Sequence, residues 1–350
     1  MRFALVGCGD ISRRYAAAIA AVPGFEVAAV TDAVGDRARA LADELGVRRH
    51  DTLDDLLAAE DVDIVVNLTA PLAHAAVSAR CLDAGRHVHT EKPLAMTYAE
   101  ARSLVELADA RGVRLSCAPA TLLGEAQQAA WKLLRDGAIG RVRLAYAEAN
   151  WGLIERWHAG AAGLHAVGPL VDVGIYPLTL LTAIFGPVRR VSAYTTTLVA
   201  ERRALDGSRF RPGAPDLAVA LLELDGGVVV RLTASFYAGT GVHRGVELHG
   251  DLGRLFLASW AEFDSRVELS VDGAEYEPQP PLREPYRGID WARPLVDLRD
   301  ALAAGRPHRA AADHAAHVVE VLEAVPRAAE SGPLDLESSF TPPEPLEWAR

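Results

Sequence analysis

Lysine is nearly absent from this chain: Lys92 and Lys132 are the only two, and arginine supplies the rest of the 36 basic residues. Arginine can therefore serve wherever a general cation suffices. A guanidinium stays protonated at physiological pH, whereas the ammonium of a buried lysine can take part in proton transfer. Lys132 lies in a stretch with the pattern of an amphipathic helix, which indicates a surface cation. Lys92 lies in Thr-Glu-Lys-Pro-Leu at residues 90–94. Whether an ammonium is required at this position depends on the motifs elsewhere in the chain.

Cysteine, positive charge and long apolar runs are also scarce. Cys8, Cys81 and Cys117 are widely spaced without a CxxC pair, which disfavours a disulfide framework and a structural zinc site, so no metal is expected. A net charge of -11 without a basic block argues against nucleic acid as a partner. No apolar run reaches the length of about 18 residues that a membrane span needs, and the N-terminus lacks a cleavage-site pattern. We expect a cytoplasmic protein that does not associate with membranes.

The first part of the chain alternates short apolar runs with helical patterns. The apolar runs lie at residues 2–6, 26–31, 64–67, 88–90 and 113–117, and the helical patterns at 11–21, 36–45, 72–84 and 98–111. Continuous apolar strands separated by helices are typical of a parallel sheet that is covered on both faces. We therefore expect an α/β domain at residues 1–121.

The pattern changes after about residue 140. Seven strand-like runs follow, at residues 142–151, 188–198, 217–224, 228–235, 246–249, 254–257 and 267–271. Asp-Gly turns at 225–226 and 272–273 are hairpin signals, so this sheet should be mostly antiparallel. Helices are expected at 169–185, 294–303 and 312–329. We assign residues 122–332 to a second domain, for substrate binding and oligomerisation, and 333–350 to an extended tail.

A glycine motif marks a dinucleotide site after the first strand. Gly7 can make the tight turn and Gly9 can let the backbone approach a pyrophosphate at the helix N-terminus, while Ser12 stands where a third glycine is usual. Asp32 ends the second strand, where a carboxylate can bind both ribose hydroxyls of adenosine and would repel a 2′-phosphate. NAD is therefore favoured, and NADP is the less favoured alternative because arginines at 37 and 39 lie nearby.

Three common classes of dehydrogenase find no support in the sequence. A short-chain dehydrogenase needs Tyr-x-x-x-Lys, but Val88 and Gln128 stand four residues before the two lysines. Three scattered cysteines cannot supply the cysteine-rich lobe of a zinc alcohol dehydrogenase. No local signature marks the His and Arg pair of a 2-hydroxy acid dehydrogenase.

Six motifs follow one another along nearly the whole chain. They are Gly-Cys-Gly-Asp-Ile-Ser at 7–12, Asn-Leu-Thr-Ala-Pro at 67–71 with His74, Glu-Lys-Pro-Leu-Ala at 91–95, Gly-Ala-Ile-Gly-Arg-Val at 137–142, Gly-Pro-Leu-Val-Asp-Val-Gly-Ile-Tyr at 168–176 and Gly-Arg-Pro-His-Arg at 305–309. In this order they resemble the Gfo/Idh/MocA family, which includes glucose-fructose oxidoreductase and inositol dehydrogenase. The resemblance implies an N-terminal Rossmann dinucleotide-binding domain and a C-terminal α+β domain with a large, mostly antiparallel open sheet.

The resemblance also implies roles for individual residues. Lys92 would reach both the nicotinamide ribose and the substrate, and Asp172 and Tyr176, four residues apart, would share one helix face and complete the catalytic set. The residues implied for cofactor binding are Gly7, Gly9, Asp10, Ile11, Asp32, Leu68, Thr69, Pro71, His74, Glu91 and Lys92.

The expected reaction follows from charge. Oxidation of a secondary alcohol sends a hydride to C4 of the nicotinamide while the hydroxyl proton leaves. A free tyrosine, with a pKa of about 10, is a poor base at neutral pH, but a nearby ammonium favours its phenolate. Tyr176 is therefore expected to be the acid and base, assisted by Lys92, with Asp172 orienting Lys92 or a substrate hydroxyl.

Departures from the family pattern point to substrate contacts. The family often carries Gly-Gly-Gly-Pro before the Asp, whereas this chain has His-Ala-Val-Gly-Pro at 165–169. His165 therefore either enters the substrate cleft or caps a loop of different shape. Trp157 and His158, just upstream, are a candidate platform for a sugar ring; a loop anchored by a buried tryptophan is an equal alternative.

The expected function is an NAD(H)-dependent oxidoreductase acting on a hydroxyl or keto group of a sugar, cyclitol or sugar derivative. A non-catalytic NAD-binding sensor of the same fold, and an isomerase or epimerase that recycles its NAD, are the alternatives. Retention of Lys92, Asp172 and Tyr176 together disfavours the sensor. The family resemblance implies a homodimer or homotetramer.

Overall fold

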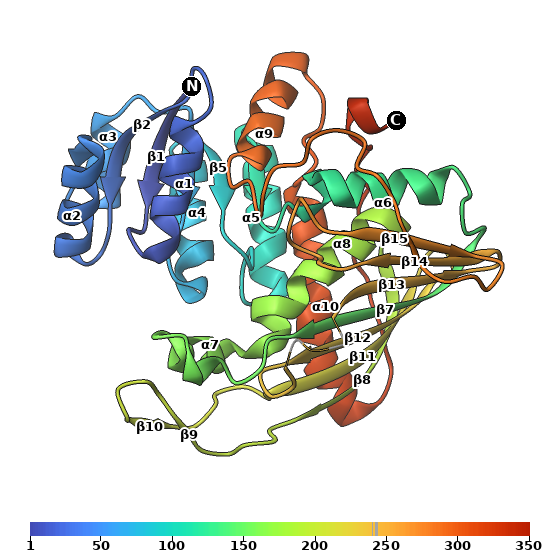
Figure 1. The fold of residues 1–350 in the computed structure, drawn as a ribbon. Coiled ribbons are helices and arrows are strands. Elements are labelled where there is room, and N and C mark those ends of the chain that lie inside the picture. The colour runs from blue at the N-terminus through green and yellow to red at the C-terminus, as the bar shows by residue number, and fades with distance from the viewer. Residues whose placement is uncertain (240, 242–243) are drawn as a thin grey trace. The chain divides into compact units, whose positions relative to one another are not determined.

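The computed structural model describes residues 1–239, 241 and 244–350. They form two compact units, one of Met1–Ala120 and Asp290–Val319 and the other of Thr121–Ile289 and Glu320–Arg350 (Figure 1). The sequence-based boundaries place residues 290–319 in the second domain, whereas in the structure the chain returns here to the first unit.

The first unit is built on a six-stranded parallel sheet. Its strand order is β3-β2-β1-β4-β5-β6, and every neighbouring pair is parallel. The strands are β1 (Arg2–Val6), β2 (Glu26–Thr31), β3 (Arg48–Arg49), β4 (Ile64–Asn67), β5 (His87–Thr90) and β6 (Leu115–Cys117). This is the strand order of a Rossmann fold, in which ligands bind outside the carboxyl ends of the strands where the order reverses, here between β1 and β4. The predicted parallel α/β domain is confirmed.

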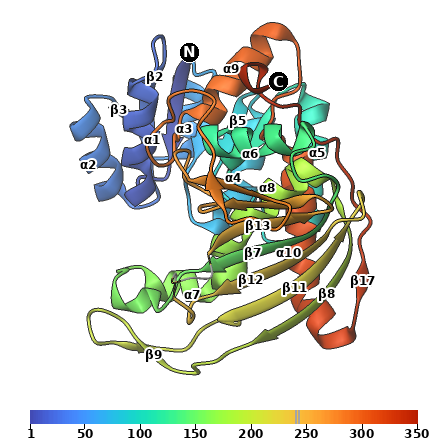
Figure 2. The same ribbon diagram turned by 45° about the vertical axis from the view of Figure 1, so that its right-hand side comes forward.

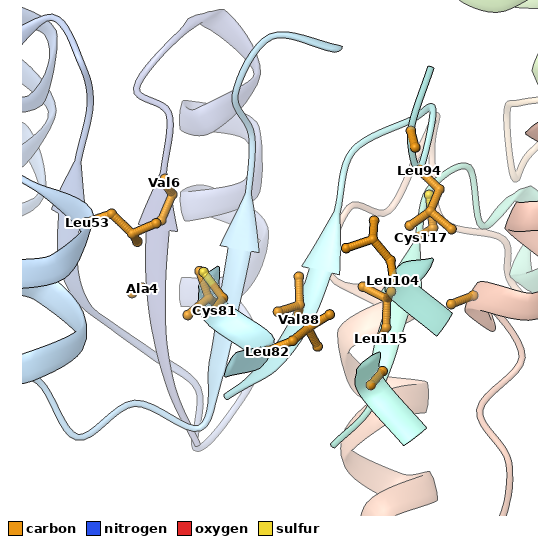
Figure 3. Close-up of a cluster of buried hydrophobic side chains, with 14 of the residues drawn as sticks. Ala4, Val6, Leu53, Cys81, Leu82, Val88, Leu94, Leu104, Leu115 and Cys117 are labelled. Atoms are coloured by element: carbon orange, nitrogen blue, oxygen red, sulfur yellow. The ribbon is translucent and has the colours of Figure 1, made fainter. Parts of the chain in front are cut away.

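Helices cover both faces of this sheet. They are α1 (Asp10–Ala20), α2 (Gly35–Leu45), α3 (Leu53–Ala59), η1 (Pro71–Ala73), α4 (His74–Asp83), α5 (Tyr98–Arg111), α9 (Arg293–Ala304) and α10 (Ala312–Ser331), the last of which continues into the second unit. Phe3 and Leu5 of β1 pack with α1, α2 and α9, whereas Ala4 and Val6 pack with α3, α4, α5 and α10 (Figure 3). Successive residues of a strand point to opposite faces, so a continuous apolar strand is what a sheet covered twice requires.

The return of residues 290–319 has a packing cause. Leu295 and Leu298 of α9 are fully buried in the cluster around Phe3, and Ala316 and Val319 of α10 are buried in the cluster on the opposite face. Both faces of the parallel sheet are therefore completed by helices from late in the chain, which short-range patterns do not reveal.

The second unit contains a nine-stranded sheet of order β16-β15-β14-β13-β7-β12-β11-β8-β17 (Figure 2). Its strands are β7 (Val142–Asn150), β8 (Val188–Thr196), β11 (Leu217–Leu224), β12 (Val229–Ser235), β13 (Gly245–Gly250), β14 (Gly253–Leu257), β15 (Val267–Val271), β16 (Glu277–Pro278) and β17 (Leu334–Asp335). Among the strands that the structure describes in this sheet, only β7 and β12 pair in parallel, so the predicted mostly antiparallel sheet is confirmed. Outside this sheet, β9 (Arg202–Arg203) and β10 (Arg209–Phe210) pair with each other.

Residues 333–350, the predicted tail, are part of the second unit. Leu334 and Asp335 pair with Val191 and Arg190 of β8, and Ala349 near the end of the chain is fully buried. The tail therefore adds an edge strand to the large sheet.

The helices of the second unit include η2 (Thr121–Leu123), α6 (Glu125–Arg135), η3 (Ile154–Arg156), α7 (Ala161–Pro169), η4 (Leu170–Gly174), α8 (Ile175–Phe185) and η5 (Glu347–Ala349). The continuous stretch 161–185 is long and apolar enough to cross a membrane by length and composition, and 72% of its most apolar window is buried inside the protein, as in a core helix. The predicted helix at 169–185 thus begins eight residues earlier, and it is broken at Gly168, whose φ of 81° and ψ of 165° are not helical.

Candidate active site

The loop between β1 and α1 has the shape that binding a phosphate group requires. Gly7 has a φ of +97°, and a Cβ there would lie 2.5 Å from the carbonyl oxygen of Leu68, so only glycine fits. Gly9 meets nothing within 4 Å of its ideal Cβ position among the described residues. Gly9 is also the N-cap of α1, and it supplies no side chain to the first-turn N–H groups. Those N–H groups and the helix dipole can therefore bind an anion.

The departure from three glycines is accommodated inside the loop. Ser12 is fully buried, and its hydroxyl donates a hydrogen bond to the carbonyl oxygen of Gly9 over 2.6 Å. A glycine at position 12 would leave room for the loop but could not bond to it. Ser12 fits in the same space and stabilises the loop through this hydrogen bond. Asp10 is exposed at the start of α1, and Ile11 is half-buried against the apolar cluster around Phe3.

Asp32, at the end of β2, ties the glycine loop to the second strand. One carboxylate oxygen accepts the N–H of Cys8 over 2.6 Å and the other accepts the N–H of Val34 over 2.7 Å. Each oxygen can accept a further hydrogen bond, so both ribose hydroxyls of adenosine can still bind there. Arg39 pairs on the surface with Asp36 over 3.0 Å, so its charge is already engaged locally.

The turn after β4 is organised by Asn67. Its amide nitrogen donates to the carbonyl of His74 and to the hydroxyl of Ser78, both over 3.0 Å, and its oxygen accepts the hydroxyl of Thr69 over 2.7 Å. Leu68 is buried, and Pro71 begins the short helix that follows. Asn67 therefore fixes the segment of which Leu68, Thr69 and Pro71 are predicted to contact the cofactor.

His74 braces two backbone segments. It is almost fully buried, with Nδ1 2.7 Å from the carbonyl oxygen of Pro93 and Nε2 2.9 Å from that of Thr69. Burial lowers the pKa of this imidazole, and a neutral ring can donate only one of the two hydrogen bonds. The contact of His74 with the cofactor stays a prediction, since both ring nitrogens face the protein backbone.

The segment that carries Lys92 is fixed by its neighbours. The N–H of Glu91 donates to the carbonyl oxygen of Asn67 over 2.9 Å, and the N–H of Lys92 donates to the carboxylate of Glu91 over 3.1 Å. Pro93 is braced by His74, as described above. Lys92 itself is half-buried. The backbone position of the lysine is thus determined on both sides.

The residues of the first unit fit a nicotinamide dinucleotide. The open space beside Gly9 lies at a helix N-terminus and suits a pyrophosphate. Asp32 presents carboxylate oxygens to a ribose, and Glu91 and Lys92 follow the carboxyl end of β5, two strands from β1. The predicted cofactor-binding residues of β1, β2, β4 and β5 therefore all lie at the carboxyl edge of one sheet, where this fold binds dinucleotides.

Asp172 and Tyr176 lie in the second unit, where the hydrogen bonding of the helix changes. η4 is a π-turn that contains Asp172, and α8 begins at Ile175. Residues four apart across such a junction stay close to the same face, and π-turns frequently mark functional sites. Gly174 allows the turn to approach β12, because a Cβ there would lie 3.2 Å from the Cβ of Ala234.

The two side chains differ in burial. Asp172 is 7% exposed, whereas Tyr176 is half-buried with its ring 5.0 Å from that of Trp260. Trp260 is in turn held by a hydrogen bond from its indole N–H to the carbonyl oxygen of Glu148 over 3.2 Å. The orientation of the Tyr176 ring is therefore supported by a tryptophan that is itself fixed.

The predicted substrate residues separate into two environments. Trp157 is 52% exposed, with its ring 5.4 Å from that of Trp151 and 5.6 Å from that of His158. His165 is only 1% exposed; its ring packs on Phe236, and its Nε2 lies 3.4 Å from the carboxylate of Glu155. The burial of His165 favours the alternative in which it shapes the loop.

Sequence reasoning missed several residues of these sites. Trp151 extends the aromatic platform at the end of β7, and Tyr15 of α1 contacts Glu91 and His89. Tyr15 lies four residues before the fully buried Ile19, so helical spacing already places it on an apolar face. A tyrosine hydroxyl on such a face requires a hydrogen-bond partner, which is the signal that was available.

Comparison with known proteins bears on both units. Residues 1–118 match the model of an oxidoreductase family with an NAD-binding Rossmann fold, and residues 127–256 match that of the GFO/IDH/MocA C-terminal domain. The chain belongs to the GFO/IDH/MocA family. It is therefore an oxidoreductase of an NAD-binding family, and the resemblance inferred from its motifs is confirmed.

Curated relatives of this chain carry the names of enzymes with different substrates. A dTDP-3,4-didehydro-2,6-dideoxy-alpha-D-glucose 3-reductase of Streptomyces violaceoruber is 36% identical over 55% of this chain, and the match spans just over half (56%) of that relative. A D-apiose dehydrogenase of Paraburkholderia graminis is 28% identical over 82% of this chain and 75% of its own. A human trans-1,2-dihydrobenzene-1,2-diol dehydrogenase is 28% identical over 81% of both chains.

Solved structures share the fold over almost the whole length. An oxidoreductase of Agrobacterium radiobacter in complex with NAD+, L-tartaric acid and magnesium has a TM-score of 0.80 at 20% identity, covering 96% of this chain and 98% of its own. The WlbA dehydrogenase of Bordetella pertussis, in complex with NADH and UDP-GlcNAcA, has a TM-score of 0.79 at 22% identity and the same coverage. The 3-ketoreductase KijD10 of Actinomadura kijaniata, with NADP and TDP-benzene, has a TM-score of 0.76 at 24% identity, covering 93% and 97%. At these identities the likeness concerns the fold.

Proposed function

We propose that this protein interconverts a secondary hydroxyl and a ketone on a sugar, a cyclitol or a sugar derivative, with NAD as the hydride carrier. One observation carries the assignment most: in a chain with two lysines, one stands in a turn whose backbone is fixed by Glu91, Asn67 and His74. The family comparison supports the reaction class, because named relatives include a sugar-nucleotide ketoreductase and an apiose dehydrogenase.

The proton chemistry is assigned to three side chains. Bound NAD supplies the site that accepts or returns a hydride at C4 of the nicotinamide. Tyr176 accepts the hydroxyl proton in the oxidative direction and donates it in the reductive direction. Lys92 contributes the positive charge that favours the phenolate, and Asp172 orients Lys92 or a substrate hydroxyl. Lys92 belongs to the first unit, and Asp172 and Tyr176 belong to the second.

Recognition of the substrate is assigned to the aromatic platform of the second unit. Exposed indole faces of Trp151 and Trp157 suit the C–H faces of a sugar ring. The Nδ1 of His158 accepts the N–H of Gly160 over 3.0 Å, which leaves Nε2 to bond a hydroxyl. The cytoplasmic location and a homodimeric or homotetrameric assembly remain part of the same proposal.

The two lysines allow a matched test of the assignment. Lys92→Arg keeps a cation but removes the titratable ammonium, and we expect turnover to fall about a hundredfold or more while the Kd for NAD changes less than about tenfold. Lys132→Arg is the control, because Lys132 pairs with Asp136 on the surface of α6 over 2.9 Å. The change in NADH absorbance at varied polyol and keto-sugar concentrations measures the turnover of both variants. Full turnover in Lys92→Arg would overturn the assignment of the lysine.

The same assay separates the alternatives. A sensor protein would bind NAD but leave its absorbance unchanged with every substrate. An isomerase or epimerase would convert the sugar without net NADH, which product analysis by chromatography would show.

A further inference from the structure

A chain of buried hydrogen bonds leads from β6, at the edge of the parallel sheet, to Glu91. The hydroxyl of Tyr15 donates to one carboxylate oxygen of Glu91 over 2.8 Å and lies 3.2 Å from Nε2 of His89. Nδ1 of His89 lies 2.9 Å from the hydroxyl of Ser116. The other carboxylate oxygen of Glu91 accepts the N–H of Lys92. Three elements, α1, β5 and β6, are thus linked to the backbone of the lysine.

Only one arrangement of protons satisfies this chain when Glu91 is ionised. A carboxylate accepts only, so the single hydroxyl proton of Tyr15 points to Glu91. The oxygen of Tyr15 must then accept the Nε2–H of His89, and Nδ1 of His89 must accept the hydroxyl proton of Ser116. Complete burial lowers the pKa of His89 to about 3, so the ring is neutral and has one donor and one acceptor, as this arrangement needs.

The direction of the hydrogen bonds concentrates their effect on one residue. Each bond polarises the next, and all of them point toward the carboxylate of Glu91. The four side chains are at most 9% exposed, so water does not compete for their polar groups. The ring of Tyr15 also makes tilted contacts with two other rings, its centroid lying 5.8 Å from that of His89 and 5.4 Å from that of Trp291.

We propose that Tyr15 is a positioning residue for Lys92, acting through Glu91, with His89 and Ser116 fixing the orientation of its hydroxyl. This inference rests on the proposed role of Lys92. Tyr15 lies on the helix that begins at the glycine loop, so one side chain couples the phosphate-binding element to the turn that carries the lysine. Nothing in the family models or the named relatives assigns such a role.

Tyr15→Phe tests the inference because it removes one oxygen and keeps the ring. One carboxylate oxygen of Glu91 loses the donor that Tyr15 supplies, and the Nε2–H of His89 loses its acceptor inside the core. We expect kcat to fall about tenfold or more, while KM for NAD stays within about threefold because the glycine loop itself is unchanged. Tyr194→Phe, on an exposed tyrosine of the second unit, is the control. A lower melting temperature with unchanged kcat would show that Tyr15 is structural only.

A double-mutant cycle with Glu91→Ala tests the route of the effect, because alanine has no side-chain acceptor for the hydroxyl of Tyr15. If Tyr15 acts through Glu91, the variant carrying both substitutions should have the same kcat as Glu91→Ala alone, since the contact is already lost. Fully multiplicative effects would overturn the proposed route.

The scarcity of lysine provides a readout that needs no turnover. Reductive methylation with ¹³C-formaldehyde labels Lys92, Lys132 and the N-terminal amine while preserving their charge. Tyr15→Phe should shift the Lys92 methyl signal in the NMR spectrum and leave the Lys132 signal in place. An unmoved Lys92 signal would overturn the positioning role, even if the wild-type protein turned over no substrate and the proposed function failed.

Ser116→Ala keeps the inference testable if Tyr15→Phe does not fold. It removes only the donor farthest from Glu91, so the Lys92 signal should move in the same direction by a smaller amount. If Ser116→Ala is folded and its Lys92 methyl signal does not shift, His89 and Ser116 have no part in positioning Lys92.

Discussion

At the scale of single residues, Asp32 combines a structural and a recognition function. Its two oxygens already accept the N–H groups of Cys8 and Val34, which brings the glycine loop and the end of β2 together. The same oxygens face the position where adenosine ribose binds in this fold. The carboxylate therefore shapes the loop, and we predict that it also disfavours a cofactor with a 2′-phosphate.

Replacing Asp32 should change the preference between cofactors. In Asp32→Ser the ribose loses charge-assisted hydrogen bonds and the 2′-phosphate of NADP no longer meets a negative charge. We expect kcat/KM for NAD to fall about tenfold or more and the ratio of NADP to NAD use to rise. Steady-state kinetics with both cofactors measures this. Asp36→Ser is the matched control, since Asp36 is exposed and pairs only with Arg39 in the described structure. An unchanged ratio in Asp32→Ser would contradict the role of Asp32.

At the scale of elements, the sequence predicts the helices and strands whose bounds are set by a short-range pattern of apolar and polar residues. The strands at 2–6, 26–31, 64–67, 217–224 and 267–271 and the helix at 98–111 have the predicted bounds, because each is an apolar or amphipathic run ended by clear turn signals. α3 and the two-residue strands were missed, since runs this short carry little periodicity. The break at Gly168 and the π-turn after it depend on packing against Ala214 and Ala234, which pattern does not encode.

The candidate sites divide in the same way. Gly7, Asp32 and Lys92 could be proposed from the sequence because each lies in a short motif with a fixed spacing from a strand. Tyr15 was not found, because its partners Glu91 and His89 are more than 70 residues away and meet it only through the strand order β1-β4-β5. Long-range hydrogen bonds of this kind follow from topology and not from spacing.

Buried histidines of the first unit should make its stability depend on pH. Burial lowers the pKa of His89 and of His314 to about 3 and that of His308 to about 4. Each ring is neutral when folded and becomes charged on unfolding below a pKa of about 6.5. The unfolded state then binds more protons, so stability is full above pH 6.5 and falls below it, by about 1.4 kcal/mol per pH unit for each histidine.

Urea unfolding between pH 7.5 and 5 measures this dependence. His308→Gln keeps a donor for the carbonyl oxygen of Leu115, which His308 contacts over 3.1 Å, and removes one titrating ring. As the pH falls, the free energy of unfolding of the variant should decrease less steeply than that of the wild type, by about 1.4 kcal/mol per pH unit, because one fewer proton is taken up on unfolding. An equal slope in His308→Gln and the wild type would refute the assignment.

At the scale of the whole molecule, the nine-stranded sheet has two unlike faces. Along β7 and β11 the buried positions are filled largely by alanine, as at Ala145, Ala147 and Ala220, and small side chains allow η4 and α8 to pack closely on the sheet. The alternating positions point to the opposite face, which the strand pattern leaves accessible. That face includes Tyr194 and Leu221, which are 61% and 48% exposed.

The accessible face has the composition of an interface between copies of the chain. Arg231 lies 4.1 Å over the ring of Tyr146 and donates to Glu148 over 2.6 Å, so opposite charges and an aromatic ring occupy its centre. In a two-fold arrangement the same patch faces itself, and an Arg and Glu pair on each copy can exchange partners across the axis. We therefore expect a second copy of the chain to cover this face, in a dimer or within a tetramer.

Light scattering after size-exclusion chromatography tests the assembly against the chain mass of 37.4 kDa. Leu221→Glu places a charge in the middle of the apolar part of the face, where pairing would bury it, and should shift the protein toward the monomer. Leu72→Glu is the control, because Leu72 is 81% exposed but lies in the first unit. A wild-type protein that is monomeric at micromolar concentration would refute the expectation. A mass that falls equally in both variants would show that the sheet face is not the surface that pairs.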